Sequence, residues 1–138
     1  MQQKDIVLIL ARDLAEHLSS AVFLVDHEGT LVYFNEGAAA ILGKTFADAG
    51  EMRIEEWSSG FSPVDFNGQP IEPRRLPLVI ALEEREPAHL AFRIKGADGM
   101  VRAIAVTAIP LFARQEDFVG AAAVFWEDTS GGHAGGGS

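Results

Sequence analysis

Residues 89–126, HLAFRIKGADGMVRAIAVTAIPLFARQEDFVGAAAVFW, decide the fold. Leu90, Phe92 and Ile94 alternate with other residues, which is the pattern of a strand with one buried face. Asp98 and Gly99 form a strong hairpin signal, because glycine tolerates the positive φ of a tight turn. The stretch predicts strands over 89–95, 101–109 and 118–126. Their short connections make neighbouring strands antiparallel.

The residues before this stretch predict a helix and two more strands. A wide apolar stripe indicates a helix over 5–18. Strands are predicted over 21–25 and 30–34, on either side of a turn that contains Gly29.

Several short helices are predicted between the two groups of strands. Asn35 is the predicted N-cap of a helix over 37–42, which Gly43 ends. Short helical turns are expected over 45–67, and Pro77 fits the first position of a helix that 78–85 completes. The order of elements indicates an α+β fold.

Composition narrows the classes of partner. The 138 residues suit one domain, and the net charge of −9 disfavours binding to nucleic acid or to a membrane surface. The chain has no cysteine, which excludes disulfides, thiolate chemistry and flavin–cysteinyl adducts and fits a cytoplasmic location. The apolar run 6–11 is too short for a signal peptide or a membrane span.

Four strings, in this order along the chain, resemble the PAS family of sensory domains. They are GTLVYFN (29–35) with AAAILG (38–43), NGQP (67–70) with LPL (76–78) and AL (81–82), DG (98–99) with PL (110–111), and VGAAAVF (119–125) leading to Thr129. The resemblance implies a five-stranded antiparallel sheet with short helices on one face and a ligand pocket between them. The expected division is an N-terminal amphipathic helix over 1–18, the PAS domain over 19–130 and a flexible glycine-rich tail over 131–138.

The family register predicts which residues surround the pocket. It places Phe23, Phe92, Val106 and their alternating neighbours inward, with Gly120, Ala122 and Val124 on the last strand. The same residues would equally fill a solid core, so the expectation of a pocket depends on the small volumes of the inward glycine and alanines. Thr107 is a further candidate polar contact. The expected ligand-binding residues are Phe23, Val25, Tyr33, Asn35, Trp57, Leu82, Phe92, Ile94, Ile104, Val106, Ala108, Ala122 and Val124.

The opposite sheet face and the N-terminal helix predict a homodimer. Both are apolar, so each needs a covering partner from its own chain or from a second copy. The expected interface residues are Ile6, Ile9, Leu10, Leu14, Ala105, Ile109, Ala123 and Phe125. A signal is expected to leave through Glu127, Asp128 and Thr129, where Glu127 stands in the position of the family's usual aspartate.

No cofactor can be assigned. Family haem sensors offer a histidine from the helix before the third strand, and the helix predicted over 78–85 has none. The four histidines lack metal-ligand spacing, so no metal site is expected.

Three functions remain open. The first is a sensor that binds a small, mostly apolar ligand, or relays a signal by rearranging its dimer, to an effector outside this chain. The second is a protein-interaction module without a ligand. The third is a small cone-shaped isomerase or dehydratase, which would need a buried acid–base pair beside the single tyrosine, Tyr33. No acid lies at the expected inward positions, so we expect no enzyme.

Overall fold

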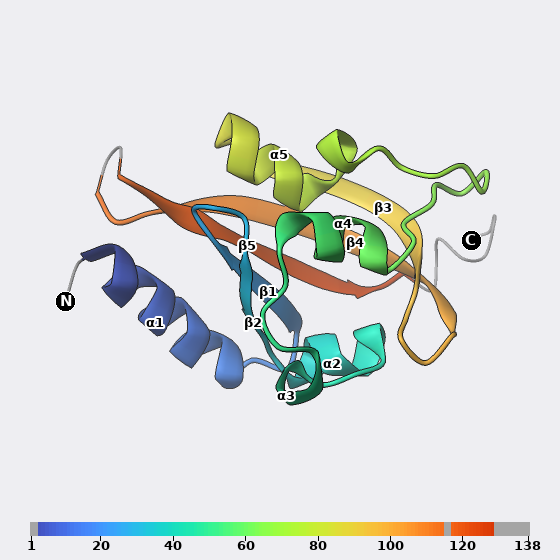
Figure 1. Cartoon of the computed structure of the whole chain (residues 1–138), viewed down its shortest axis with the longest axis horizontal. Coiled ribbons are helices and arrows are strands. Elements are labelled where there is room, and N and C mark those ends of the chain that lie inside the picture. The colour runs from blue at the N-terminus through green and yellow to red at the C-terminus, as the bar shows by residue number, and fades with distance from the viewer. Residues whose placement is uncertain (1–2, 115–116, 129–138) are drawn as a thin grey trace.

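A computed structural model describes residues 3–114 and 117–128. Five strands form one sheet, with the helices arranged about it (Figure 1). In chain order the elements are α1 (Gln3–Glu16), β1 (Ala21–Asp26), β2 (Leu31–Phe34), α2 (Glu36–Leu42), α3 (Phe46–Ala49), α4 (Ile54–Gly60), the 3-10 helix η1 (Pro73–Arg75), α5 (Pro77–Glu84), β3 (Ala88–Lys95), β4 (Val101–Phe112) and β5 (Phe118–Glu127).

The sheet has the order β2-β1-β5-β4-β3, and all its neighbouring strands are antiparallel. The last three strands therefore lie side by side, as predicted. The first hairpin joins the sheet through β1, which pairs with β5 in the centre.

Local sequence explains how the short helices begin and end. The Asn35 side chain accepts a hydrogen bond from the backbone N–H of Ala38 at 3.0 Å, which caps α2. Gly43 ends this helix with a φ of 83°, a conformation that glycine adopts without strain. Pro77 occupies the first turn of α5, where its missing N–H has no helical partner to lose.

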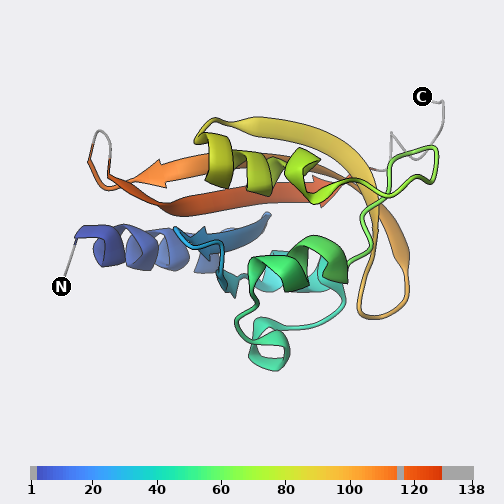
Figure 2. The same cartoon turned by 45° about the horizontal axis from the view of Figure 1, so that its top comes forward.

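The two faces of the sheet carry different layers. The main core lies between the sheet and the short helices, and its fully buried side chains include Phe34, Leu31 and Val25. On the other face, α1 contacts β1, β4 and β5 and lies apart from the remaining helices (Figures 1 and 2). Ala15 of α1 packs there with Leu24 and Ala122.

The predicted facing of β5 is wrong. Ala123 and Phe125, expected at the outer face and in the dimer interface, belong to the main core. Ala122 and Val124, expected inward, face α1 instead. Alternation defines two sets of residues but does not say which set is inward, and a shift of one residue exchanges the faces of the whole strand.

Gly120 also fails to open the pocket. It pairs with Asp26 and with Leu111, and Leu111 packs on the α1 side. A Cβ at Gly120 would clash with the Val25 carbonyl oxygen, so the glycine is needed for the close approach of β5 to β1.

The helix α1 turns its small residues toward the sheet and its large ones outward. It ends at Glu16, two residues earlier than the pattern predicts. Ala15 is buried, whereas Leu10 and Leu14 are 61% and 63% exposed. Ile6 and Ile9 are exposed in the same way. Among the described residues, no helix is long and apolar enough to cross a membrane.

Candidate functional site

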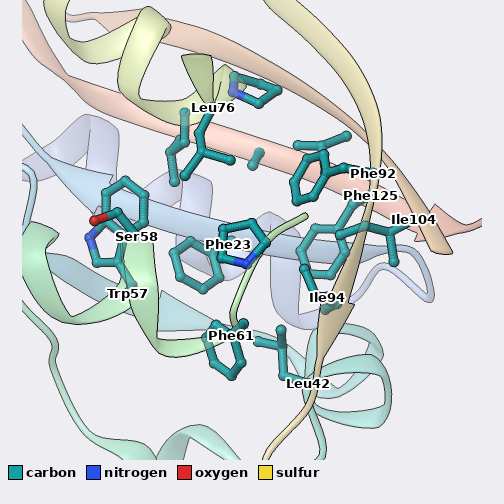
Figure 3. Close-up of a pocket in the computed structure, with 15 residues that line it drawn as sticks. Phe23, Leu42, Trp57, Ser58, Phe61, Leu76, Phe92, Ile94, Ile104 and Phe125 are labelled. Atoms are coloured by element: carbon teal, nitrogen blue, oxygen red, sulfur yellow. The ribbon is translucent and has the colours of Figure 1, made fainter. Parts of the chain in front are cut away.

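A small cavity lies between the sheet and the short helices. Its volume is about 90 Å³. In Figure 3, Phe23 lies near the middle of the group, Trp57 and Ser58 lie at one end, and Phe125 and Ile104 lie at the other. The lining residues are Phe23, Leu42, Trp57, Ser58, Phe61, Pro63, Leu76, Pro77, Leu78, Phe92, Ile94, Ile104, Val106, Ala123 and Phe125.

Aromatic packing shapes the wall near Phe23. Its ring lies parallel to that of Phe34 at a centroid distance of 6.0 Å, and it meets the Trp57 indole edge-on at 5.9 Å. Both geometries are favourable for aromatic pairs. The pairs hold the Phe23 ring between the β1–β2 hairpin and α4, so the cavity has a fixed wall on this side.

The cavity wall has very little polar surface. Trp57 donates its indole N–H to the carbonyl oxygen of Gly29 at 2.7 Å, so that donor is already satisfied. Ser58, which is 6% exposed, carries the remaining polar side chain of the wall, and no buried side-chain nitrogen or oxygen of the described residues is left without a hydrogen-bond partner. The cavity is therefore suited to an apolar molecule with at most one polar group.

Six of the residues expected at the ligand line this cavity: Phe23, Trp57, Phe92, Ile94, Ile104 and Val106. Val25 and Ala108 lie in the adjoining core, and Leu82 packs against that core. Tyr33, Ala122 and Val124 lie on the α1 side of the sheet. Thr107 lies on the outer face too, where its hydroxyl is 2.9 Å from Nδ1 of His89.

Sequence reasoning missed the contributions of the short helices and the loop after α4. Leu42, Ser58 and Phe61 line the cavity, as do Pro63 and the run 76–78. The segment 45–67 has no clear periodicity, so its facing could not be assigned. Trp57 and Phe61 are four residues apart, a spacing that places both on one side of a helical turn and could have indicated that they face the core together.

Asn35 has a structural role and does not reach the cavity. Its Oδ1 accepts from the N–H of Val22 at 3.0 Å as well as from Ala38. Its Nδ2 donates to the carbonyl oxygens of Ala15 and Ser20 at 2.9 and 2.8 Å. Asn35 therefore ties the end of α1 to the starts of β1 and α2.

Tyr33 lies near charged side chains of α1 and α2. The Arg12 guanidinium lies over the Tyr33 ring, 4.6 Å from its centroid. Burial raises the pKa of Tyr33 above its ordinary value, and the nearby Glu16 carboxylate raises it further, whereas Arg12 acts in the opposite direction. Phe46 packs edge-on against the same ring. Tyr33 stays protonated here and is separated from the cavity by the sheet.

An ion pair between Arg102 and Asp98 lies near Leu42, at one end of the cavity. Arg102 donates to Asp98 at 2.9 Å and to the carbonyl oxygen of Ile41 at 2.8 Å. The hydrogen bond from Arg102 holds the pKa of Asp98 below its ordinary value, helped by the backbone N–H of Met100. This contact joins the β3–β4 hairpin to the end of α2, and both elements contribute to the cavity wall.

The expected signal exit lies at the end of β5. Glu127 pairs with Ile104, a residue of the cavity wall, and the N–H of Asp128 donates to the carbonyl oxygen of Ala103 at 2.8 Å. Thr129 and the expected tail over 131–138 lie outside the described residues.

The cavity does not fit the cofactors common in sensory domains. At about 90 Å³ it is well below the roughly 300 Å³ or more that a drug-sized molecule requires, so a haem or a flavin would need a large rearrangement. The described residues that line it include no side chain that commonly ligates haem iron, and His89 lies on the outer face. No cluster of three potential metal ligands exists in the part of the chain that the structure describes.

Comparison with known families and structures agrees with this architecture. The family described as the PAS fold matches residues 15–131. No protein with a curated description matches the chain.

Three solved structures illustrate the similarity. The PAS domain of a protein from Colwellia psychrerythraea is 16% identical, with a TM-score of 0.63 over 89% of this chain and 98% of that one. The PAS domain of BvgS from Bordetella pertussis is 19% identical, with a TM-score of 0.58 over 92% and 90%. The LOV protein of Rhodobacter sphaeroides is 18% identical, with a TM-score of 0.66 over 97% and 78%. At these identities the similarity establishes the fold alone.

Proposed function

The chain belongs to the PAS family of sensory domains. From that membership we propose that it senses a small apolar molecule in the cavity between the sheet and the short helices, and relays the binding through β5 to α1. The observation that carries the proposal is the facing of β5. Ala123 and Phe125 line the cavity, whereas Ala122 packs on the α1 side of the sheet. A displacement of β5 that begins at the cavity therefore also changes the packing of β5 against α1.

The size of the cavity limits the ligand. An engineered apolar cavity of about 150 Å³ accepts benzene, so about 90 Å³ accommodates a single ring only with small movements of the wall. Such movements are the expected source of the signal, because a close-packed interior transmits a local change in volume. A ligand that entered an ample, rigid pocket would leave β5 unmoved.

The second strand that supports the relay is β1, which pairs with β5. Phe23 lines the cavity, and its neighbours Val22 and Leu24 pack in the α1 layer. Leu24 pairs with Ala122 on the neighbouring strand. At this level, therefore, one face of β1 and β5 contacts the cavity and the opposite face contacts α1. Ala15 of α1 packs on this platform.

The α1 surface supports a homodimer as the output of the sensor. Ile6, Leu10 and Leu14 are four residues apart and are 40%, 61% and 63% exposed, so they form one apolar stripe along the helix. Trp126 and Ile109 on the outer sheet face are 48% and 42% exposed. Two copies related by a two-fold axis would cover this surface with itself, which is the commonest form of soluble dimer.

The output then passes to an effector through the end of β5. Glu127 and Asp128 follow directly from the strand that carries both the cavity wall and the α1 platform. In this proposal the effector is a separate protein or further domain, and the sensor acts in the cytoplasm without catalysis. None of the described residues that line the cavity is acidic or a histidine, so they provide no acid–base pair, which supports the last point.

An interaction module without a ligand is the second candidate, favoured by the small size of the cavity. Native mass spectrometry of the chain purified from cells, compared with its denatured mass, separates the two. The proposed function predicts a dimer that retains, or takes up when it is supplied, a small molecule. A dimer that takes up no small apolar compound would support the interaction module, and a strictly monomeric chain would contradict the proposed output.

A further inference from the structure

We infer that residues 53–60, which contain α4, form a strap that opens without unfolding the rest of the domain and so admits the ligand to the cavity. The strap opens on the side of the segment that runs from η1 to α5. The inference rests on the proposed function, because it concerns entry to the same cavity. It adds the element that moves and the route that the ligand takes.

The strap is anchored to the sheet at both of its ends. Just before it, Met52 exchanges two backbone hydrogen bonds with Leu31 of β2, at 2.7 and 3.3 Å. Just after it, the carbonyl oxygen of Phe61 accepts from the N–H of Lys95 in β3 at 2.8 Å. The strap can therefore leave the surface of the domain while its ends keep their places.

One side chain attaches the middle of the strap. Within the described residues, the hydrogen bond that joins the strap to a distant part of the chain is the one from the Trp57 indole N–H to the Gly29 carbonyl oxygen. The same indole packs edge-on against Phe23. Trp57 lines the cavity, so releasing this attachment also removes part of the cavity wall (Figure 3).

The helix α4 is weakly supported in comparison with α5. The helix α5 packs on β3, β4 and β5, whereas in the described part of the chain α4 makes no comparably extensive backbone contact with any helix or strand. It has seven residues, fewer than the roughly 12–15 that an isolated helix needs to be even marginally stable in water. Once Trp57 is released, α4 therefore unravels. Local opening of such a segment requires less free energy than unfolding of the whole domain.

A groove on the surface marks the route. It lies between α4 and the segment from η1 to α5, which are on the same side of the sheet (Figure 1). Among the described residues, Ser58 is the one that lines both the groove and the cavity, so a small side chain separates the two at this point. The groove is lined by Ile54, Glu55, Ser58, Ser59, Glu72, Pro73, Arg74, Val79 and Glu83. Displacement of α4 joins the groove to the cavity.

Hydrogen exchange at the Trp57 indole N–H tests the opening itself. It is measured by NMR on the whole chain at urea concentrations below the unfolding transition, beside the amides of β5. Local opening exposes little surface, so the Trp57 rate should depend weakly on urea, whereas the β5 amides should follow global unfolding.

Glu56→Ala should make the strap open more often. The Glu56 carboxylate accepts from the backbone N–H of Arg53 at 2.7 Å and so caps the start of α4, while it lines neither the cavity nor the groove. Loss of such a cap should raise the exchange rate of the Trp57 indole about fivefold. Glu84→Ala is the matched control, because Glu84 is also an exposed glutamate of a short helix, α5, and lines neither space.

Entry is measured with toluene on the chain labelled at its isoleucine δ1 methyl groups. Ile94 and Ile104 line the cavity and report its occupancy, and Ile109 on the outer face is the internal reference. Exchange between the free and bound signals gives the rates of entry and exit. Glu56→Ala should raise both rates about fivefold and leave the dissociation constant unchanged, because the closed form holds the ligand in both proteins.

The outcomes separate this inference from the proposed function. If the Trp57 indole exchanges only through global unfolding, with the urea dependence of the β5 amides, the strap is overturned and the sensor proposal stands. If Glu56→Ala speeds exchange at Trp57 but not the entry of toluene, the role of the strap in entry is overturned and the sensor proposal again stands. If toluene at millimolar concentration shifts neither Ile94 nor Ile104, the sensor proposal is overturned, and the role of the strap in entry with it.

Discussion

Ala123 of β5 pairs with Phe23 of β1, and both side chains line the cavity. One residue away on each strand, Ala122 pairs with Leu24, and both of these side chains pack on the α1 side. The central pair of strands is thus the shared wall of the cavity and of the helix platform. The relay proposed for this domain depends on that arrangement.

Filling the cavity should abolish ligand binding. In Ala123→Leu the larger side chain occupies the space beside Phe23. Added toluene should therefore no longer shift the NMR signals of the δ1 methyl groups of Ile94 and Ile104, which line the cavity. Overpacking should lower the free energy of unfolding by about 1–3 kcal/mol. Ala122→Leu, on the opposite face, is the control and should retain toluene binding. Undiminished binding in Ala123→Leu would place the ligand elsewhere.

Trp57→Phe should destabilise the domain through one hydrogen bond. The change leaves the buried Gly29 carbonyl oxygen without the indole N–H that it accepts at 2.7 Å. We expect a loss of about 1–3 kcal/mol in urea unfolding. Trp126→Phe, at a side chain that is 48% exposed, should change stability by less than about 0.5 kcal/mol. Equal losses in the two variants would contradict the structural role of the Trp57 hydrogen bond.

Asn35→Ala should detach α1 as well as lower stability. The Asn35 side chain bonds to three segments of chain, so we expect a loss of roughly 2–4 kcal/mol. Asn35→Asp keeps the cap of α2 but places a carboxylate against the carbonyl oxygens of Ala15 and Ser20. Hydrogen exchange should therefore show faster exchange in α1 for both variants. Normal protection of α1 in Asn35→Asp would rule out this attachment.

Leu10→Glu should break the proposed dimer with little effect on the folded monomer. Leu10 is 61% exposed and makes the α1 stripe with Ile6 and Leu14. A carboxylate there would be desolvated in the dimer, and a buried unpaired charge is strongly unfavourable. Val101→Glu is the matched control, since Val101 is also 61% exposed but lies in β4 near the β3–β4 turn. Sedimentation velocity should show a monomer for Leu10→Glu only.

The contact between Asp98 and Arg102 should make stability depend on acid pH. The pKa of Asp98 is lowered in the folded chain, first by the Arg102 hydrogen bond, so the unfolded chain binds its proton more readily. The contact is fully stabilising above the ordinary value of 3.8 and is lost as the pH falls through the lower folded value. The difference in stability between the wild type and Asp98→Asn should therefore shrink below pH 3.8. A difference that grows with acid would reverse the sign of this effect.

Much of the fold could be predicted because the sequence marks its turns clearly. Gly29, Gly43 and the Asp98 and Gly99 pair all stand where the chain turns or a helix ends. The alternation of Leu90, Phe92 and Ile94 also defines β3 as a strand with one buried face.

The cavity could be predicted only in part, because β5 is almost uniformly small and apolar. In GAAAVF, over 120–125, either set of alternating residues is chemically suitable for the core. The choice is made by pairing with β1, where Phe23 is inward and its partner Ala123 must share that face. Ser58 could not be found for a different reason: α4 is seven residues long, too short for its facing to be read from periodicity.

The central claim is that a molecule in the cavity changes the state of α1 through β5. The most direct test is amide hydrogen exchange across α1 and β5, measured by NMR with and without saturating toluene, on the sample whose Ile94 and Ile104 methyl groups report occupancy. We predict that toluene in the cavity changes the amide exchange rates of Ala122 and Ala15, which belong to the same cluster on the α1 side of the sheet. Full occupancy with unchanged exchange along α1 would contradict the relay.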